Sequence, residues 1–383
     1  MKVLHIASWY PHSKDPFDGD FVQRHAKALS LYMRVDVIHV VQNFQLLQRE
    51  EGHVEEMNDE NLFSKVYFPA FPKIKNRLLQ KLLFAKRYNQ TMKRALLQYM
   101  QEHGKPDLIH VHVPVKGGYA ALHLKRKLGI PFVVTEHSSA YFPDTENNFF
   151  HASRYFRFIT QQSFEQAAVV SSVSNWLLKR LNDLFTISQA KLVRNVVDTN
   201  LFYPVSKTGI KKRFIHVSMM FPMKNVEGMI DALYLLEQQT QDWEMVFVGN
   251  ASDDLKQKAK SLGDHVRWAG VLSYAAVAKE MQAADALIHF STYENLPCVI
   301  NEALCCGLPV ISSRVGGIDE IVNETNGMLV ESKDTRALAN AMLTFLQQPD
   351  RFSKTSISSN ATAQFSYEAI GKEFISVYKE ILK

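Results

Sequence analysis

Short apolar runs alternate with longer amphipathic segments along the chain, and this alternation constrains the fold more than any other feature of the sequence. Strands of a parallel sheet read as nearly continuous apolar runs, because helices cover both faces of the sheet. Helix-spaced segments between such runs predict an α/β fold. The expected strands are residues 3–7, 35–41, 108–113, 132–135 and 169–173 in the first half, and residues 214–217, 245–248, 286–290 and 310–312 in the second half.

Two such series in one chain predict two doubly wound domains. The chain has 383 residues, more than the roughly 250 to 300 at which a single hydrophobic core stops growing. Proline, glycine and charged residues interrupt the pattern in YPVSKTGIKKRF, residues 203–214, just before a new strand. We therefore expect a first domain over residues 1–204, completed by an amphipathic C-terminal helix over residues 366–383, and a second domain over residues 205–365.

Charge and cysteine content exclude several classes of protein. The formal net charge of +5 is too small for a protein that coats nucleic acid, so we expect no nucleic-acid partner, but it suits a phosphate-bearing ligand. Cys298, Cys305 and Cys306 lie together in one helical segment, which fits neither a disulfide framework nor a zinc site. The N-terminus lacks a secretion signal and no long apolar run follows, so we expect a cytoplasmic protein that does not span a membrane.

The segment TYENLPCVINEALCCGLPV, residues 292–310, places Glu294 in the loop after a predicted strand and Glu302 on the helix that follows. Ligands of open α/β sheets bind at the carboxyl ends of strands. Pro297 suits the first helical position, and Gly307 suits the end of the helix. Backbone N–H groups at this helix start would form a site for phosphate. A simpler interpretation is that Glu302 is a solvated surface residue and Glu294 an acid favoured by the helix dipole.

The surrounding sequence resembles the hallmark region of the family 4 retaining glycosyltransferases with the GT-B architecture. The resemblance rests on the two glutamates, on ALCCGLPV, on GGIDE at residues 316–320, and upstream on NVVDTNLFYP, FIHVSMMFPMKNVEGMIDAL and VGN. It is strong over residues 190–335 and weak over residues 42–100. It implies two Rossmann-like domains that face each other across a cleft, and transfer of a sugar from a nucleotide-diphosphate sugar to an acceptor hydroxyl with retention of configuration.

The same resemblance implies roles for residues of the second domain. Lys224 would bind the donor diphosphate, where positive charge stabilises the leaving group. Glu302 would hold the ribose hydroxyls and Glu294 would contact the transferred sugar. Asn295 and Leu296 would present backbone N–H groups to the sugar or phosphate.

One stretch departs from the family pattern. Relatives commonly carry a glycine and an arginine where this chain has Ser218 and Met219. The missing guanidinium removes a bidentate phosphate donor. Ser218 remains a candidate donor-binding residue. Either another basic residue, such as Arg314, substitutes for the arginine, or the backbone carries more of the phosphate charge.

The first domain supplies the acceptor side in this family. Gly19, in DPFDGDFVQRHAKAL, matches a position where the backbone approaches the diphosphate or the acceptor, a contact suited to glycine. Asp18 and Asp20 stand where many relatives have glycine, and they either touch acceptor hydroxyls or cap the following helix. His137 follows a strand and matches a family position near the reacting sugar.

His110 and His112 alternate on one strand and so face the same side. This pair could mimic a metal site, but a packed core with one ring turned toward the site is the favoured interpretation. The chain also lacks the paired-aspartate metal motif of the other large glycosyltransferase fold. We therefore expect no metal and no cofactor beyond the nucleotide-sugar donor, of UDP or GDP type.

Residues 73–94, KIKNRLLQKLLFAKRYNQTMKR, contain eight basic residues and no acidic ones, with leucines at roughly helical spacing. A basic amphipathic helix can lie on an anionic membrane. The segment from Lys73 to Arg94 thus predicts peripheral contact with the inner face of the cell membrane, which suits a sugar or lipid-linked sugar acceptor in bacterial surface polysaccharide or glycolipid synthesis. The alternative is a helix that covers the core and exposes a solvated basic face.

Three other functions stay open or are disfavoured. An epimerase or phosphorylase with a GT-B-like fold could act on related sugar phosphates, although the glutamate spacing fits the transferases better. An inactive scaffold that binds nucleotide sugars is conceivable because of Met219, but Lys224, Glu294 and Glu302 are all retained. A dinucleotide oxidoreductase is disfavoured, because no Gly-x-Gly-x-x-Gly follows the first strand of either domain.

Overall fold

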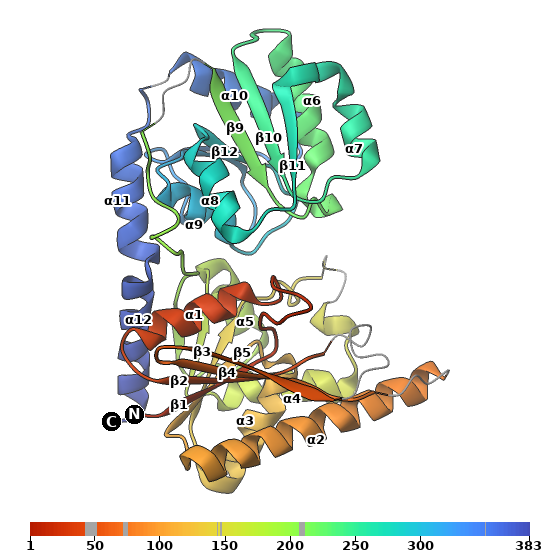
Figure 1. Cartoon of the computed structure of the whole chain (residues 1–383), viewed down its shortest axis with the longest axis vertical. Helices are drawn as coiled ribbons and strands as arrows, with labels where there is room; N and C mark the ends of the chain where they lie inside the picture. Colours follow the sequence, from red (N-terminus) through yellow and green to blue (C-terminus); the bar gives the residue numbers. More distant parts are fainter. Residues whose placement is uncertain (43–51, 72–75, 144, 146–147, 207–210, 349) are drawn as a thin grey trace. The chain divides into compact units, whose positions relative to one another are not determined.

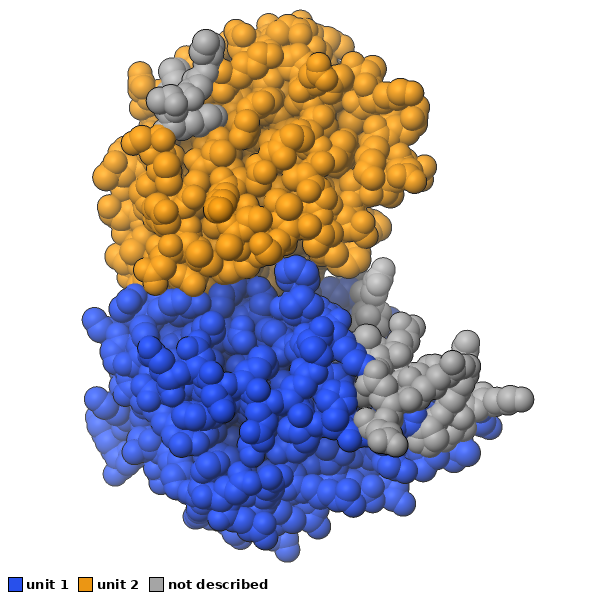
Figure 2. All heavy atoms as spheres, in the orientation of Figure 1, with its two compact units in different colours: residues 1–194, 367–383 blue, residues 195–366 orange. Residues whose placement is uncertain are grey.

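The computed structural model describes residues 1–42, 52–71, 76–143, 145, 148–206, 211–348 and 350–383. The chain forms two compact units, Met1–Arg194 with Tyr367–Lys383, and Asn195–Ser366 (Figure 2). The division falls upstream of the expected boundary between residues 204 and 205, because Asn195 and the residues after it already pack within the second unit. Part of the expected linker, residues 207–210, lies outside the described residues.

The first unit is built on an eight-stranded sheet with the order β3-β4-β2-β1-β5-β6-β7-β8. Every pairing is parallel except that of β3 with β4. The strands are β1 Val3–Ala7, β2 Val35–Val40, β3 His53–Asp59, β4 Leu62–Phe68, β5 Leu108–His112, β6 Phe132–Glu136, β7 Val169–Ser172 and β8 Ala190–Leu192. Strands β1, β2, β5, β6 and β7 are buried along their whole length, as their apolar runs predict.

Helices cover this sheet (Figure 1). They are α1 Asp20–Ser30, α2 Arg77–His103, α3 Pro114–Leu128, α4 Arg154–Gln166, α5 Asn175–Leu184 and the C-terminal α12 Tyr367–Ile381, with a short 3-10 turn, η1, at Phe149–His151. The core joins strand residues such as Ile6 and Val134 to helix residues such as Met92 of α2 and Leu177 of α5. Helix α12 packs on α1, so the last helix belongs to the first unit.

The second unit has a six-stranded, wholly parallel sheet with the order β11-β10-β9-β12-β13-β14. Its strands are β9 Lys212–Val217, β10 Trp243–Val248, β11 Val266–Gly270, β12 Ala286–His289, β13 Val310–Ser313 and β14 Gly327–Val330. Its helices are α6 Val226–Glu237, α7 Asp253–Lys258, α8 Tyr274–Gln282, α9 Cys298–Cys305, α10 Thr335–Gln347 and α11 Lys354–Phe365, with 3-10 turns η2 Pro222–Lys224, η3 Lys260–His265 and η4 Ile318–Glu320. Both units are therefore Rossmann-like, as expected.

Each sheet has a point where the strand order reverses, and open α/β sheets bind ligands there. The reversal lies between β1 and β5 in the first unit and between β9 and β12 in the second. Of the helices that follow these four strands, α6 has a side-chain cap, in which Asn225 accepts a hydrogen bond from the backbone N–H of Gly228. Helices α1, α3 and α9 begin after Gly19, Val113 and Pro297, none of which gives a side-chain cap.

Two local predictions needed correction. Helix α9 begins at Cys298, with Pro297 as the extended residue before it rather than the first helical residue. Five strands were not predicted, namely β3, β4, β8, β11 and β14. The nine predicted strands are all present, with ends that differ by two residues at most.

The three cysteines are free thiols, and Cys305 and Cys306 are buried. Burial raises the pKa of the Cys306 thiol to about 12, so this side chain behaves as a small core residue. Among the helices of the described residues, none is long and apolar enough to cross a bilayer.

Candidate active site

Lys224 and Glu294 meet at the reversal point of the second sheet. Lys224 closes the turn η2 after β9, and Glu294 lies in the loop after β12, so the adjacency of these two strands brings them together. Lys224 Nζ lies 2.5 Å from Glu294 Oε1. The two loops are also joined through the backbone, since the N–H of Thr292 donates to the carbonyl of Met223 at 2.8 Å. The proposed cation and carboxylate thus belong to one preformed site.

The Glu294 carboxylate is buried among several donors. His289 Nε2 lies 2.9 Å and Ser291 Oγ 2.7 Å from the same oxygen that Lys224 contacts. Burial by itself would raise the pKa of Glu294, but the hydrogen bond from His289 and the charge of Lys224 outweigh burial and lower it to about 2. Burial lowers the pKa of His289, so His289 is neutral and donates its Nε2 proton. Glu294 is therefore an ionised, fixed acceptor at neutral pH.

Ser218 is held at the end of β9 by a second buried histidine. The Ser218 hydroxyl lies 2.7 Å from His216 Nε2 and accepts the backbone N–H of Met220 at 3.0 Å. His216 Nδ1 lies 3.0 Å from the carbonyl of Ile288 on β12, which makes Nδ1 the protonated nitrogen and Nε2 the acceptor of the hydroxyl proton. Burial lowers the pKa of His216 to about 3. The Ser218 hydroxyl is thus held by His216 and the backbone of Met220, and His216 in turn contacts the neighbouring strand β12.

At the position of the family's arginine, Met219 is 47% exposed. Arg314, the example given above of a basic substitute, follows β13 and lies 3.9 Å from Asp319 and 3.8 Å from Glu331, with a half-exposed side chain. Its guanidinium is therefore balanced by one carboxylate after β13 and one after β14.

Gly316 allows the loop after β13 to lie directly against the Glu294 loop. Its φ is +61°, and a Cβ at this position would lie 2.2 Å from the carbonyl oxygen of Glu294 and 2.8 Å from that of Asn295. The next residue, Gly317, donates its N–H to the Asn295 carbonyl at 2.8 Å. The GGIDE motif thus acts through packing, because its first glycine lets two site loops touch.

Glu302 lies on the buried face of α9. It is 5% exposed, so the interpretation of a solvated surface residue is wrong. Tyr274, the first residue of α8, donates its hydroxyl to Glu302 Oε1 at 3.1 Å. The Tyr274 ring packs on Phe202, with centroids 4.8 Å apart. The Tyr274 hydroxyl thus fixes one oxygen of a buried carboxylate on α9.

Asn295 and Leu296 form the connection between Glu294 and α9. Both are buried. Their carbonyl groups are used by the protein, since Gly317 donates to Asn295 and the side-chain amide of Asn195 donates to Leu296 at 3.2 Å. The loop is thus rigidly anchored while the start of α9 has no side-chain cap.

In the first unit, the backbone conformation and the close packing at position 19 require glycine. Its φ is +62°, and a Cβ would lie 2.4 Å from the backbone carbon of Trp9. Asp20 pairs with Arg24 one turn later at 3.1 Å, and Asp18 lies 3.8 Å from His12 Nε2. Neither aspartate caps α1 with its side chain. Burial, reinforced by Asp15, raises the pKa of Asp18 to about 6.

His137 follows β6 and is half-buried. Its ring lies 4.6 Å from that of Phe21 on α1, so the α1 start and the β6 end meet. Its backbone N–H donates to Glu136 Oε1 at 2.8 Å. The same oxygen accepts the N–H of Ser138 at 2.7 Å, and Tyr141 donates its hydroxyl to the other oxygen at 2.7 Å. Glu136 therefore fixes the turn that carries His137.

A cavity of about 490 Å³ opens beside this turn. It is lined by Trp9, Ser138, Ala140, Tyr141, Asn148, Phe149, His151, Ala152, Ser153 and Phe156. Aromatic rings beside polar groups suit a sugar, which has both apolar faces and hydroxyls. The cavity is thus a candidate acceptor site within the first unit.

The sequence matches two families over consecutive segments. Residues 49–201 match Glycosyltransferase Family 4, and residues 202–364 match Glycosyl transferases group 1. The boundary between the matches lies close to the boundary between the two units. The chain is a family 4-like glycosyltransferase with the GT-B fold.

Known relatives resemble this glycosyltransferase at low sequence identity. The N-acetyl-alpha-D-glucosaminyl L-malate synthase of Bacillus anthracis is 24% identical, over 72% of this chain and 75% of the synthase. The O-antigen chain mannosyltransferase B of Escherichia coli is 24% identical, over 64% of this chain and 70% of that enzyme. Among solved structures, Anabaena Alr3699/HepE in complex with UDP has a TM-score of 0.72 at 20% identity, covering 99% of this chain and 100% of that chain.

Several residues that build the glycosyltransferase site were not predicted. His289 and Ser291 hold Glu294, His216 holds Ser218, Tyr274 holds Glu302, and Glu136 fixes the turn at His137. A signal was present for three of them: His216, His289 and Glu136 are polar residues at the carboxyl end of otherwise apolar strands.

Proposed function

We propose that this glycosyltransferase transfers a sugar from a nucleotide-diphosphate sugar, of UDP or GDP type, to an acceptor hydroxyl with retention and without a metal ion. The observation that carries the proposal is the contact between Lys224 and Glu294 at the reversal point of the second sheet. A fixed cation beside an ionised carboxylate suits a donor whose diphosphate gains negative charge while its sugar hydroxyls need an acceptor. The complex of Anabaena Alr3699/HepE with UDP supports a donor of this class.

In the proposed reaction, the bond between the anomeric carbon and the diphosphate oxygen breaks while the acceptor oxygen attacks the same face of the sugar. The acceptor proton passes to the departing phosphate oxygen, so no charge is left unbalanced. Lys224 stabilises the charge that develops on the diphosphate, and Glu294 orients the sugar. Glu302 binds the ribose hydroxyls, and the N–H groups of the loop at Asn295 and Leu296 bind sugar or phosphate.

On the acceptor side, His137 lies near the reacting sugar in this proposal, and the cavity bounded by Trp9 and Phe156 takes the acceptor. Asp18 lies beside His12 and is not used as a helix cap, and in this proposal it contacts an acceptor hydroxyl. Asp20 is paired with Arg24 and stays a weaker candidate. Gly19 positions the loop between Trp9 and α1, and in this proposal its backbone also approaches the donor.

Calorimetric titration with UDP, GDP, ADP and their sugar conjugates, with a chelator present throughout, tests this function. Saturable binding of one nucleotide class, followed by consumption of its sugar conjugate when an acceptor is supplied, is the expected result. Binding without any turnover would favour the inactive scaffold, and conversion of the sugar without transfer would favour the epimerase. Binding that appears only when the chelator is replaced by a divalent ion would contradict metal independence.

We propose in addition that α2 contacts the cytoplasmic face of the membrane, which suits a lipid-linked acceptor in surface polysaccharide synthesis. Of the predicted segment, residues 73–75 lie outside the described residues, and the rest begins α2. Met92 is buried in the core, whereas Leu79 and Leu82 are 49% and 61% exposed. Helix α2 therefore covers the core with one face and presents leucines beside basic residues with another, as membrane-surface helices do.

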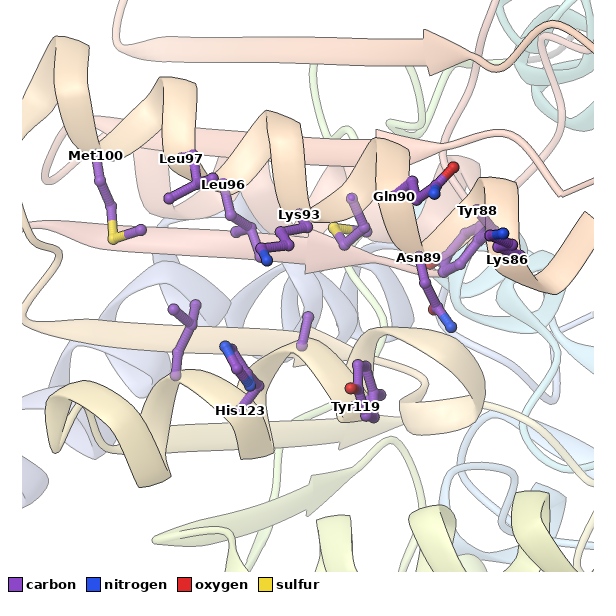
Figure 3. A pocket seen from close by; sticks show the side chains of 13 residues that line it. Lys86, Tyr88, Asn89, Gln90, Lys93, Leu96, Leu97, Met100, Tyr119 and His123 are labelled. Carbon is purple, nitrogen blue, oxygen red and sulfur yellow. The ribbon is translucent and has the colours of Figure 1, made fainter.

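A groove between α2 and α3 adds to this surface. It has a volume of about 370 Å³, and Figure 3 shows the side chains of α2 and α3 that face it. Lys86 and Lys93 lie at the groove beside Leu97, Met100 and Tyr119. Apolar walls beside two ammonium groups match the chemistry of an anionic lipid. The name of the Escherichia coli relative, an O-antigen chain mannosyltransferase, agrees with a role on a surface polysaccharide.

A further inference from the structure

A continuous line of side-chain hydrogen bonds runs through the interior of the first unit and ends at His137. We name it the histidine chain. In order, it consists of His137, His112, His5, Tyr378, His110, Thr135 and Ser171. Its members come from β1, β5, β6, β7 and α12, and the turn after β6.

The first half of the histidine chain joins His137 to the C-terminal helix. His137 Nε2 lies 3.4 Å from His112 Nδ1, and His112 Nε2 lies 3.2 Å from His5 Nδ1. His5 Nε2 lies 3.4 Å from the Tyr378 hydroxyl. His5, His112 and Tyr378 are completely buried, so water does not compete for these contacts.

The second half leads from Tyr378 back into the sheet. The Tyr378 hydroxyl lies 2.5 Å from His110 Nδ1, and His110 Nε2 lies 2.6 Å from Thr135 Oγ1. Thr135 Oγ1 in turn lies 2.6 Å from Ser171 Oγ. All four residues are completely buried.

Three imidazoles in the interior of the histidine chain, those of His5, His110 and His112, are neutral. Burial, reinforced by the charge of His25, lowers the pKa of His5 to about 3. Burial also lowers the pKa values of His110 and His112 well below the usual range. A neutral imidazole has one N–H donor and one acceptor nitrogen, and each of these three rings has a partner at both nitrogens.

This arrangement gives the histidine chain a direction. If His137 donates to His112, then His112 must donate to His5 and His5 to the Tyr378 hydroxyl, because each neutral imidazole carries one proton. If His137 accepts, these steps are reversed, and Tyr378, whose proton then goes to His5, must accept from His110. A mixture of directions among the rings would place two protons or two lone pairs against each other in a buried site, which is costly. The four groups from His137 to Tyr378 therefore switch together.

We propose that the histidine chain sets which ring nitrogen of His137 carries the proton, so that His112, His5 and Tyr378 are positioning residues for His137. The structural part of this proposal concerns the His137 tautomer alone. Its consequence for catalysis rests on the proposed function, in which His137 lies near the reacting sugar. Tyr378 is the link that joins the two halves, and its hydroxyl can be removed with little change in volume.

Nitrogen-15 NMR of the full chain labelled at histidine tests the proposal, with His137 resonances assigned by their loss in His137→Gln. In the native protein, one His137 nitrogen should show the shift of a protonated nitrogen and the other that of an unprotonated one. In Tyr378→Phe the two shifts should move toward each other, because the shortened chain no longer enforces one direction. Unchanged His137 shifts in Tyr378→Phe, or averaged shifts in the native protein, would overturn the proposal.

Tyr99→Phe is the matched control, because its buried hydroxyl donates to Asp36 at 3.2 Å and lies outside the histidine chain. It should leave the His137 shifts unchanged. If Tyr378→Phe does not fold, Thr135→Val removes another hydroxyl of the chain, and Thr135→Ser should restore the native shifts. For activity, Tyr378→Phe should lower kcat by about tenfold or more with an unchanged donor KM, as loss of outer partners of a functional imidazole does. The NMR result does not depend on turnover of any donor. Failure of the tautomer proposal can therefore be distinguished from failure of the proposed function.

Discussion

Lys224 Nζ lies 2.5 Å from Glu294 Oε1, although the two residues are 70 positions apart in the sequence. The contact exists because β9 and β12 are neighbours at the reversal point of their sheet. Both side chains are mostly buried, so the pair is held before any donor arrives. A preformed charge arrangement needs no reorganisation during the reaction, which is the condition under which electrostatic stabilisation is most effective.

Replacing Lys224 tests its proposed action on the leaving diphosphate. Lys224→Ala should lower kcat by about a hundredfold or more, the size of effect seen when one charge-stabilising donor is lost. Steady-state kinetics with the donor identified by calorimetry would measure it. Lys256→Ala, which removes an exposed lysine of the same unit paired with Asp253, should keep full activity. Full turnover by Lys224→Ala would remove this lysine from the reaction.

Glu302 is predicted to bind the donor ribose. Glu302→Ala should weaken nucleotide affinity by about 1.5 to 3 kcal/mol, the range for hydrogen bonds to a charged group. Glu302→Gln keeps the shape and one acceptor oxygen and should lose less. Calorimetric titration of both variants with the nucleotide alone gives the comparison. Equal affinity of the alanine variant and the native protein would show that the buried carboxylate serves the fold only.

Gly316→Ala should destabilise the second unit and impair the site. The added Cβ would lie 2.2 Å from the Glu294 carbonyl oxygen, so the two loops must separate. Gly129→Ala is the control, because its φ of +66° is similar to the +61° of Gly316 and nothing lies within 4 Å of its Cβ position. Chemical denaturation should show a loss of about 1 to 2 kcal/mol for Gly129→Ala from backbone strain, and a further 1 to 3 kcal/mol or so for Gly316→Ala from overpacking. Equal losses would refute the close packing of the loops.

The raised pKa of buried Glu136 predicts that the free energy of unfolding depends on pH in a specific way. Burial raises its pKa from the model-compound value of 4.5 to about 7, although Tyr141, Ser138 and His137 donate to it. Above pH 4.5 the unfolded carboxyl ionises while the folded one stays protonated, so this group's contribution falls as the pH rises from 4.5 to 7. The loss should reach about 3 kcal/mol. The free energy of unfolding of Glu136→Gln, measured at both pH values, should lack this part of the decline; identical pH profiles would show that the Glu136 pKa does not change on folding.

Membrane contact through α2 can be measured by sedimentation with vesicles. Native protein should bind vesicles that contain anionic lipid and should bind neutral vesicles weakly. Lys86→Glu combined with Lys93→Glu should weaken binding by more than about tenfold, since each lysine near such a surface contributes about 1 kcal/mol. Lys279→Glu, on α8 of the second unit, changes an exposed charge elsewhere and should have little effect. Binding that survives the double reversal would place the membrane surface on another part of the chain.

The sequence predicted the fold where burial makes apolar runs continuous. Strands such as β1 and β12 are buried along their length, and these were found with nearly correct ends. The strands that were not found lie where one or both faces meet solvent. The seven residues of β3 are largely exposed, and β11, with Arg267 and Gly270, is only partly buried. Hairpin pairing with β4 and packing at a sheet edge stabilise these segments, and neither leaves an apolar run.

The site residues could be predicted through a resemblance, but their surroundings could not. Lys224, Glu294 and Glu302 belong to recognisable motifs. His289 supports Glu294 because the loop after β12 brings the Glu294 carboxylate back to the end of that strand. Gly19 was predicted from the same resemblance, but its close contact with Trp9 was not. Both contacts depend on how a loop folds back on the strand before it, and a single sequence does not contain loop conformation in readable form.

Helix α12 lies in the first unit although residues 195–366 precede it in the chain. Its Tyr378 and Phe374 cover His110, with ring centroids 5.7 Å and 5.2 Å away. During synthesis on the ribosome, residues 1–194 therefore emerge long before the helix that closes their interior. Until Tyr367 and the residues after it leave the exit tunnel, the polar interior of the first unit stays open to water. Final maturation of the amino-terminal half must accordingly wait until α12 has been synthesised.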